Sequence, residues 1–414
     1  ETAAADCDGG VDDYAAPNKL SNSKCKAGEP ITLPVNVLSR LVIEKQTIPD
    51  GLADSFDFSG TITDPINGEV AITPFALMDG GEQELTGALD ATYQVTESIP
   101  DGFALDSIVC TNQTTGAPAN VTTNTVTGEV TVVMSGSQFD VRCVYTNDQL
   151  PGQLTIVKNA NGGNDTFSFA YGVTGQTPNA FSLTTAGGTA QQTFQITTGL
   201  GETYRVLESL TTAQVNDGWR IDSATCYYDD DPTTPIGTVQ RTDPDLIAVD
   251  GFTIDAGDAV TCTFVNNAPA QLTVTKITQG GDDTFRFLTL GLPAPNDIFF
   301  ITTMMGSGSN GPITVPIPDS STGVDIDIVE DINNTPGWNL VDITCSGTDE
   351  TVNSNLVDII LQPGDVVDCT FTNVADGQIS VVKNTLGGDG TFGFVTDIPG
   401  ATSPFSLTTT DNSA

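Results

Sequence analysis

Apolar and polar residues alternate in short segments along most of the chain, and one such segment recurs four times. The four copies are Leu41-Val-Ile-Glu-Lys45, Leu154-Thr-Ile-Val-Lys158, Leu272-Thr-Val-Thr-Lys276 and Ile379-Ser-Val-Val-Lys383. A period of two residues with many Val and Thr is typical of β-strands that bury one face. A turn with Gly or Asp and a second alternating strand follow each copy, so the unit is expected to begin as a hairpin.

Two further motifs complete the unit in the first three copies. The first motif ends in a Glu and precedes a turn and a large aromatic residue; its copies are Tyr93-Gln-Val-Thr-Glu97, Tyr204-Arg-Val-Leu-Glu208 and Ile326-Asp-Ile-Val-Glu330. The second motif starts with Cys and ends in Asn; its copies are Cys143-Val-Tyr-Thr-Asn147, Cys262-Thr-Phe-Val-Asn266 and Cys369-Thr-Phe-Thr-Asn373. Because no helical period is sustained anywhere, the sequence predicts an all-β chain of tandem antiparallel β-sandwich domains in a linear array.

The motif positions divide the chain into five parts. These are an acidic N-terminal segment with a Cys pair (1–37), repeats 1 to 3 (38–149, 150–269 and 270–375) and an incomplete repeat 4 (376–414). Repeat 4 has no Glu strand and no Cys-to-Asn strand, so we expect the natural chain to continue with more repeats. The alternative is donation of the segment 31–35 by a neighbouring subunit, although Asn36 has the wrong parity to face Lys383.

Composition and charge exclude several classes of function. With 53 Asp and Glu against 13 Lys and Arg, the formal net charge is -40. Phosphate backbones and anionic lipids would repel such a chain, so we expect no nucleic acid partner. No stretch approaches the ~18 consecutive apolar residues of a membrane span, so we expect no membrane insertion. The chain has no His and therefore no Ser-His-Asp or Cys-His catalytic system, and we do not expect an enzyme. A start at Glu1 without a leader fits an extracellular protein after signal-peptide removal.

Strand parity places three polar side chains of each repeat on an apolar face. Lys158 shares its face with Leu154 and Ile156, Glu208 with Tyr204, and Asn266 with Cys262. The same parity holds for Lys45, Glu97 and Asn147 in repeat 1 and for Lys276, Glu330 and Asn373 in repeat 3. A buried ion without a partner costs several kcal/mol, so the three side chains are expected to meet in each core.

The first-strand Lys, the Tyr-x-x-x-Glu motif with its following Pro-Asp-Gly-aromatic turn, and the last-strand Asn resemble the Cna B-type (SpaA-like, prealbumin-like fold) domains of bacterial surface proteins and pilins. The resemblance implies spontaneous isopeptide bonds; the pairs by position are Lys45–Asn147, Lys158–Asn266 and Lys276–Asn373, assisted by Glu97, Glu208 and Glu330, with Lys383 left unpaired. Desolvation favours the neutral forms of Lys and Glu, and a neutral amine is a nucleophile. The alternative is a buried Lys–Glu ion pair hydrogen-bonded by Asn.

The eight cysteines are expected to form disulfides, because their number is even and secreted proteins meet an oxidising environment. Their places in the repeat select the pairs Cys110–Cys143, Cys226–Cys262 and Cys345–Cys369, which leaves Cys7–Cys25 in the N-terminal segment. Reduced thiols are the alternative. Trp219 and Trp338 are expected to fill the cores after a turn rather than to stack on sugars.

No cofactor is expected, although the acidic loops Asp229-Asp-Asp231 and Asp282-Asp283 leave Ca²⁺ binding open against a merely solvated acidic surface. The leading hypothesis for function is a secreted surface protein that forms a rigid stalk, fibre or pilus-like filament. Its partners would be head-to-tail subunits or further repeats of the same chain. The alternative is an adhesin that binds a host, cell or matrix ligand through its loops or its N-terminal segment.

Overall fold

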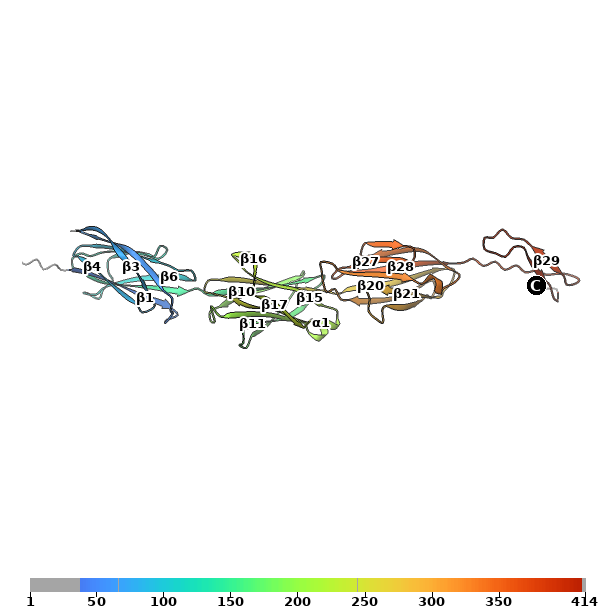
Figure 1. Cartoon of the computed structure of the whole chain (residues 1–414), viewed down its shortest axis with the longest axis horizontal. Helices are drawn as coiled ribbons and strands as arrows, with labels where there is room; N and C mark the ends of the chain where they lie inside the picture. The colour runs from blue at the N-terminus through green and yellow to red at the C-terminus, as the bar shows by residue number, and fades with distance from the viewer. Residues whose placement is uncertain (1–37, 66, 244, 412–414) are drawn as a thin grey trace, which may run out of the picture.

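The computed structural model describes residues 38–65, 67–243 and 245–411, and in it three β-sandwiches follow one another along the long axis of the molecule (Figure 1). The predicted all-β array is therefore confirmed. Helical structure in the described ranges consists of α1 (Thr212–Asn216) and the 3-10 turn η1 (Ile332–Asn334). The N-terminal segment 1–37, with the predicted Cys7–Cys25 pair and the segment 31–35, lies outside the described residues.

Each complete repeat consists of two facing sheets. In repeat 1 the first sheet has the order β4 (Glu82–Ala88), β1 (Leu38–Ile48), β9 (Asp140–Gln149), β6 (Phe103–Asn112). The second sheet has the order β3 (Gly68–Leu77), β2 (Phe56–Asp64), β5 (Thr92–Ser98), β8 (Glu129–Val133), β7 (Val121–Asn124).

Repeats 2 and 3 have the same plan. The sheets of repeat 2 are β13 (Thr189–Ile196), β10 (Gly152–Asn161), β19 (Ala259–Asn267), β15 (Arg220–Tyr228), β16 (Asp231–Ile236), and β12 (Asn179–Thr184), β11 (Thr166–Val173), β14 (Thr203–Ser209), β18 (Leu246–Thr253), β17 (Thr238–Asp243). The sheets of repeat 3 are β23 (Ser307–Val315), β20 (Ala270–Gln279), β28 (Val366–Ala375), β25 (Trp338–Ser346), and β22 (Ile298–Thr302), β21 (Thr284–Leu290), β24 (Val324–Glu330), β27 (Leu356–Leu361), β26 (Glu350–Asn353).

The prediction that each unit begins as a hairpin is wrong. The first two strands of a repeat lie in opposite sheets, and the first strand instead pairs in parallel with the last: β1 with β9, β10 with β19, and β20 with β28. Alternation along a strand reports only which residues face the core, and both arrangements bury the same faces. A pairing between segments a whole repeat apart leaves no local signal in the sequence.

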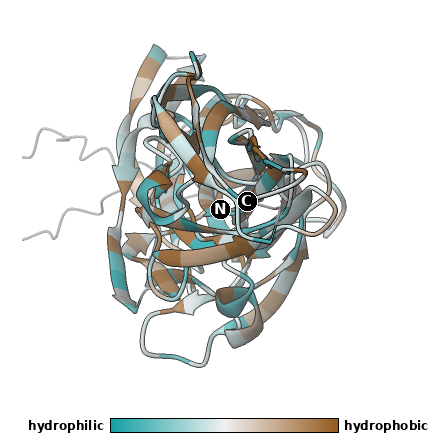
Figure 2. Ribbon diagram, turned by 90° about the vertical axis from the view of Figure 1, so that its right-hand side faces the viewer, coloured by the Kyte–Doolittle hydropathy of each residue, from teal (hydrophilic) through white to brown (hydrophobic). Residues whose placement is uncertain are grey.

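The apolar faces of the two sheets form one core in each repeat. Along β14 the residues with even numbers, such as Tyr204, Val206 and Glu208, are buried, whereas their neighbours are partly exposed or exposed. Viewed along the string, hydrophobic and hydrophilic segments alternate on the strands (Figure 2). Trp219 packs edge-on against Phe167 with 5.2 Å between ring centroids and is buried, as expected for a residue that fills the core.

The fourth repeat consists of one antiparallel pair, β29 (Thr391–Phe394) and β30 (Phe405–Thr408). The segment from Ile379 to Lys383, predicted as a strand, forms no strand here, and Ile379 is 71% exposed. In the complete repeats this strand lies between two neighbours, for example β13 and β19 around β10. The 414 residues contain no counterpart of the last strand for repeat 4, so the segment 379–383 lacks this neighbour. Its alternating pattern alone does not suffice to form a strand.

Candidate functional site

The parallel pairing of the first and last strands brings Lys and Asn of each repeat to the same place in the core. Lys45 on β1 lies level with Tyr145 on β9, and Asn147 is two residues further along on the same face. The registers in repeats 2 and 3 are the same, with Lys158 level with Phe264 and Lys276 level with Phe371. The Glu comes from the opposite sheet, on its central strand β5, β14 or β24.

The structure therefore brings the predicted residues together in all three repeats. Every one of these nine side chains is at most 2% exposed, and they are Lys45, Glu97, Asn147, Lys158, Glu208, Asn266, Lys276, Glu330 and Asn373. We call each set of Lys, Glu and Asn a triad. Of the strands that carry them, Figure 1 labels β1, β10, β20 and β28, which run along the length of their sandwiches.

In the triad of repeat 1, Lys45 faces the amide of Asn147. Lys45 Nζ donates a hydrogen bond to Asn147 Oδ1 at 2.9 Å and lies 3.6 Å from Glu97 Oε1. Asn147 Nδ2 is buried and has no hydrogen-bond partner. The side chain of Asn147 also acts on the carboxyl group of Glu97, whose pKa it lowers against the effect of burial.

In the triad of repeat 2, the carboxyl group lies between the other two side chains. Glu208 Oε1 is 3.1 Å from Lys158 Nζ and accepts a hydrogen bond from Asn266 Nδ2 at 2.6 Å. Asn266 Oδ1 is buried without a hydrogen-bond partner. A carboxyl group in this position is within reach of both the amine and the amide.

The triad of repeat 3 makes both kinds of contact at once. Lys276 Nζ donates to Asn373 Oδ1 at 2.5 Å, and Asn373 Nδ2 donates to Glu330 Oε1 at 2.5 Å. The amine and the other carboxyl oxygen, Oε2, are 3.4 Å apart. The Tyr of the motif is replaced by Ile326 in this repeat, and the triad keeps its geometry without it.

Burial shifts the pKa of the amine and of the carboxyl group in opposite directions. Desolvation lowers the pKa of Lys158 and of Lys276 to about 8, against the attraction of the neighbouring carboxylate, and lowers the pKa of Lys45 as well. Desolvation also raises the pKa of Glu97, Glu208 and Glu330, which the nearby amine partly counteracts. Both shifts favour a neutral amine beside a neutral carboxylic acid.

A phenyl ring that the sequence analysis did not assign to the site covers each lysine. Phe56, Phe167 and Phe285 have their ring centroids 4.1, 4.6 and 4.6 Å from Nζ of Lys45, Lys158 and Lys276. The signal in the sequence is the Phe-x-Phe pattern of the second strand, in which the first Phe covers the amine. Lys383 has the same contact, 4.4 Å from the ring of Phe392, but it is only half-buried and has no Glu or Asn partner strand in the 414 residues.

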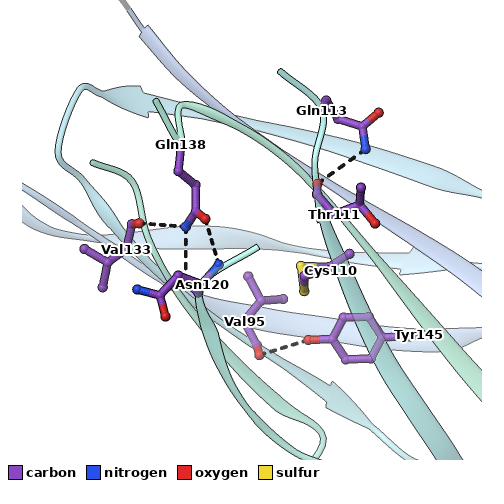
Figure 3. The surroundings of a disulfide bond; sticks show 9 residues. Val95, Cys110, Thr111, Gln113, Asn120, Val133, Gln138 and Tyr145 are labelled. Atoms are coloured by element: carbon purple, nitrogen blue, oxygen red, sulfur yellow. Dashed lines mark hydrogen bonds between the residues drawn. A yellow bond between two sulfur atoms is a disulfide. The ribbon is translucent and has the colours of Figure 1, made fainter. Parts of the chain in front are cut away.

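Each complete repeat also contains the predicted disulfide: Cys110–Cys143, Cys226–Cys262 and Cys345–Cys369. The bond joins the last strand to its antiparallel neighbour, on the side away from the first strand. Near the disulfide of repeat 1, the Tyr145 hydroxyl donates to the Val95 carbonyl of the opposite sheet at 3.3 Å (Figure 3). The Cys of the disulfide and the Asn of the triad therefore share the buried face of the last strand, but their partners lie on the two opposite neighbouring strands.

Three carboxylates of the acidic loops considered for Ca²⁺ accept hydrogen bonds within the fold. Asp282 accepts hydrogen bonds from the backbone amides of Met305 and Gly306, and Asp283 accepts one from Thr284. Asp231 accepts from the hydroxyl of Thr233. A different acidic group, which the sequence analysis did not single out, brings together carboxylates of Asp325, Asp327 and Asp358 on β24 and β27.

In the described part of the chain, no helix has the length and hydrophobicity of a membrane span, since α1 has five residues and η1 has three. Curated protein sequences include no match to the chain. Similar solved structures include the Bacillus anthracis TIE protein, with 14% identity, a TM-score of 0.33, and 81% of this chain covered; the chain spans half of that protein.

Two further similar structures come from pilus proteins. The C-terminal fragment of the pilus adhesin SpaC from Lactobacillus rhamnosus GG has 12% identity and a TM-score of 0.30, over 55% of this chain and 96% of the fragment. The major pilin from Streptococcus pyogenes has 16% identity and a TM-score of 0.23, over 55% of this chain and 99% of the pilin.

The family model of the prealbumin-like fold domain matches the chain three times, over residues 41–149, 154–268 and 272–375. These matches cover most of the chain, and each includes one complete triad and one disulfide. The chain thus belongs to the family of prealbumin-like fold domains of the SpaA type, present as three tandem copies.

Proposed function

We propose that the chain is a secreted structural protein of the bacterial surface, a rigid stalk, fibre or pilus-like filament whose three complete repeats are each closed by a Lys–Asn isopeptide bond. The observation that carries this proposal is the triad, which is buried and has contacts of 2.5–3.6 Å in three successive repeats. Its partners are subunits of the same chain or further repeats, arranged head to tail.

The proposed reaction needs only groups of the triad. The neutral Nζ of Lys attacks Cγ of Asn, a new C–N bond forms, and the bond from Cγ to Nδ2 breaks, so that Nδ2 leaves as ammonia. The protonated Glu donates a proton towards the amide and takes one from the attacking amine, and it ends in the protonation state in which it began. No oxidation occurs. The fold holds amine and amide in contact, which supplies a high effective concentration.

The position of the bond suits a protein under tension. A pull on the string enters repeat 2 at the start of β10 and leaves it at the end of β19, and Lys158 and Asn266 lie near the same ends of these parallel strands. With the bond in place, force would pass from β10 directly to β19. The chain between residues 159 and 265 would carry no load, so the sandwich would not unfold under a pull along the string.

The mass of the folded protein tests the proposal. We expect the intact chain to be lighter than its sequence by three ammonia molecules in addition to the hydrogens lost in disulfides, and the deficit should survive boiling and reductant. Lys158→Ala or Glu208→Ala should reduce the deficit by one ammonia. Lys383→Ala is the matched control, because this lysine has the same ring contact but no Asn partner, and it should leave the deficit unchanged.

Fragment masses after proteolysis then assign each bond to its repeat. A chain with the full mass of its sequence would leave only the buried ion pair for the triads and would contradict the covalent part of the proposal. Electron microscopy of the purified protein tests the structural role, since a stalk or filament should give straight, unbranched particles. Compact particles would contradict that role independently of the mass.

A further inference from the structure

The same turn occurs in repeats 2 and 3, where it joins the last two strands of the repeat. It lies at the end of the sandwich that faces the preceding repeat. In repeat 2 it spans 255–258 and in repeat 3 it spans 362–365; we call these the docking turns. Two hydrogen bonds close each turn. In repeat 2 the amide of Asp258 donates to the Asp255 carbonyl, and the amide of Asp255 donates to the Asp258 carboxylate. In repeat 3, Asp365 and Gln362 make the same two bonds. Gly257 and Gly364 occupy the third position, with φ of +82° and +80°.

Each docking turn rests with its backbone against a glycine of the preceding repeat. At junction 1, between repeats 1 and 2, a Cβ on Gly102 would lie 2.6 Å from the carbonyl oxygen of Ala256, and one on Gly257 would lie 3.2 Å from Cα of Gly102. At junction 2, between repeats 2 and 3, a Cβ on Gly364 would lie 2.2 Å from the carbonyl oxygen of Gly162. Any side chain at Gly102 or Gly364 would force the two repeats apart.

The connections between repeats leave little room for such a movement. Two residues, Leu150 and Pro151, separate β9 from β10, and two, Ala268 and Pro269, separate β19 from β20. The amide of Leu150 donates to the Gly102 carbonyl at 2.8 Å. The docking turns also hold the incoming strand, because the amides of Gln153 and Gln271 donate to the carbonyls of Asp258 and Asp365 at 2.7 Å.

We propose that the docking turn is an interaction surface for the distal end of the preceding repeat, and that its glycine contact fixes the angle between successive repeats. The partner on each side is a prealbumin-like repeat of the same chain. The contact is made by backbone atoms, joined at junction 1 by the Cβ of Ala256, and it leaves no room for a side chain at Gly102 or Gly364. It therefore resists bending without any cross-link. This role does not depend on the proposed isopeptide bonds, which lie inside the repeats.

The glycines of the chain provide matched controls for a test. Gly364→Ala adds a methyl group at the contact, whereas Gly337→Ala adds one in the same repeat where no atom lies within 4 Å. Both positions have positive φ, +80° and +89°, so the two variants share the backbone strain of Ala in this region. Gly257→Ala and Gly251→Ala form the corresponding pair in repeat 2, with φ of +82° and +86°.

The measurement is the distance between spin labels on noncanonical amino acids in the full chain, placed at Val239 on β17 and Val352 on β26, which are exposed. An oxygen and a carbon in contact are about 3.5 Å apart, so Gly364→Ala must separate the backbones by roughly 1 Å. We expect this variant to shift and broaden the distance distribution, and Gly337→Ala to reproduce the parent distribution.

Thermal unfolding of the two variants should be alike, which shows that repeat 3 folds equally well in both. If Gly364→Ala gives the parent distribution, the glycine contact does not set the angle and the proposal is wrong. An equal shift in Gly364→Ala and Gly337→Ala would attribute the effect to strain inside repeat 3 and would contradict it as well. The masses of the variants report the isopeptide bonds separately, so the two proposals can fail independently.

Discussion

The chemistry of the triads depends on what burial does to single ionisable groups. Lys158 is fully buried under the ring of Phe167 and beside Glu208, so neither an ammonium nor a carboxylate has water around it. The neutral forms are then less costly, and they are the forms that an aminolysis of Asn requires. Burial therefore destabilises a repeat without the proposed bond and favours the protonation states that the proposed reaction requires.

A variant that cannot form the bond makes this cost measurable. In Asn266→Ala, Lys158 remains titratable; in the parent chain, desolvation lowers the pKa of this amine to about 8, against an ordinary value of 10.5. Between these pH values the unfolded chain binds a proton that the folded chain does not, so the free energy of unfolding rises with pH. The cost from Lys158 is complete below pH 8, is lost towards pH 10.5, and amounts to roughly 3 kcal/mol.

Denaturant unfolding of repeat 2 at about pH 7.5 and about pH 10, on either side of the folded pKa of Lys158, checks this expectation. Both Asn266→Ala and its control, Lys158→Met with Asn266→Ala, also carry Glu208→Gln, because the buried carboxyl group would otherwise titrate together with the amine. The control has no amine to titrate. The stability of Asn266→Ala should increase relative to this control as the pH rises. A constant difference between the two variants would mean that Lys158 keeps an ordinary pKa in the folded chain.

At the scale of strands, the last strand of each repeat has a disulfide on one side and the proposed isopeptide bond on the other. In repeat 2, β19 has a disulfide to β15 on one side and the proposed isopeptide bond to β10 on the other. Cys262 is level with Ile156, and Asn266 is level with Ala160, so the two attachments are spaced along β19. The disulfide and the proposed isopeptide bond would restrict different parts of the unfolded chain, so either bond would remain when the other is removed.

Removal of the disulfide in repeat 2 should therefore weaken the repeat without unfolding it. The bond closes a loop with a sequence separation of 36, and its loss in Cys226→Ser with Cys262→Ser should cost up to roughly 3–4 kcal/mol. Calorimetry should show a lower unfolding temperature for one repeat, whereas resistance to protease at room temperature should persist. The same change at Cys345 and Cys369 should affect repeat 3 only. If loss of the disulfide unfolds a repeat completely, the last strand of that repeat has no second attachment.

The strand faces, and with them the triads, could be predicted from the sequence, whereas the strand neighbours could not. Parity alone placed Lys158, Glu208 and Asn266 on buried faces, because a side chain two residues from a buried one points the same way. The parallel pair of β10 and β19 involves residues more than a hundred positions apart, and no turn between them reports it. The contact of Gly162 with Gly364 was likewise invisible, since glycine is also the ordinary residue of a turn.

At the scale of the whole molecule, the two junctions differ in how many contacts hold them. Junction 2 has two hydrogen bonds in addition to its glycine contact: Asn267 Nδ2 donates to the Ile317 carbonyl at 3.2 Å, and the Ser320 hydroxyl donates to Asp222 at 2.7 Å. At junction 1 the described residues make no side-chain hydrogen bond between repeats. The string is therefore expected to bend more readily at junction 1.

Two label pairs in the parent chain compare the junctions directly. The distance between Val70 on β3 and Val239 spans junction 1, and that between Val239 and Val352 spans junction 2; all three residues are exposed. We expect the broader distribution for the first pair. Ser320→Ala removes one bond of junction 2 and should broaden the second distribution, whereas Ser321→Ala, whose hydroxyl bonds only within its own loop to Asp319, should not. Equal widths in the parent chain, or no effect of Ser320→Ala, would show that the glycine contacts alone determine the stiffness of the string.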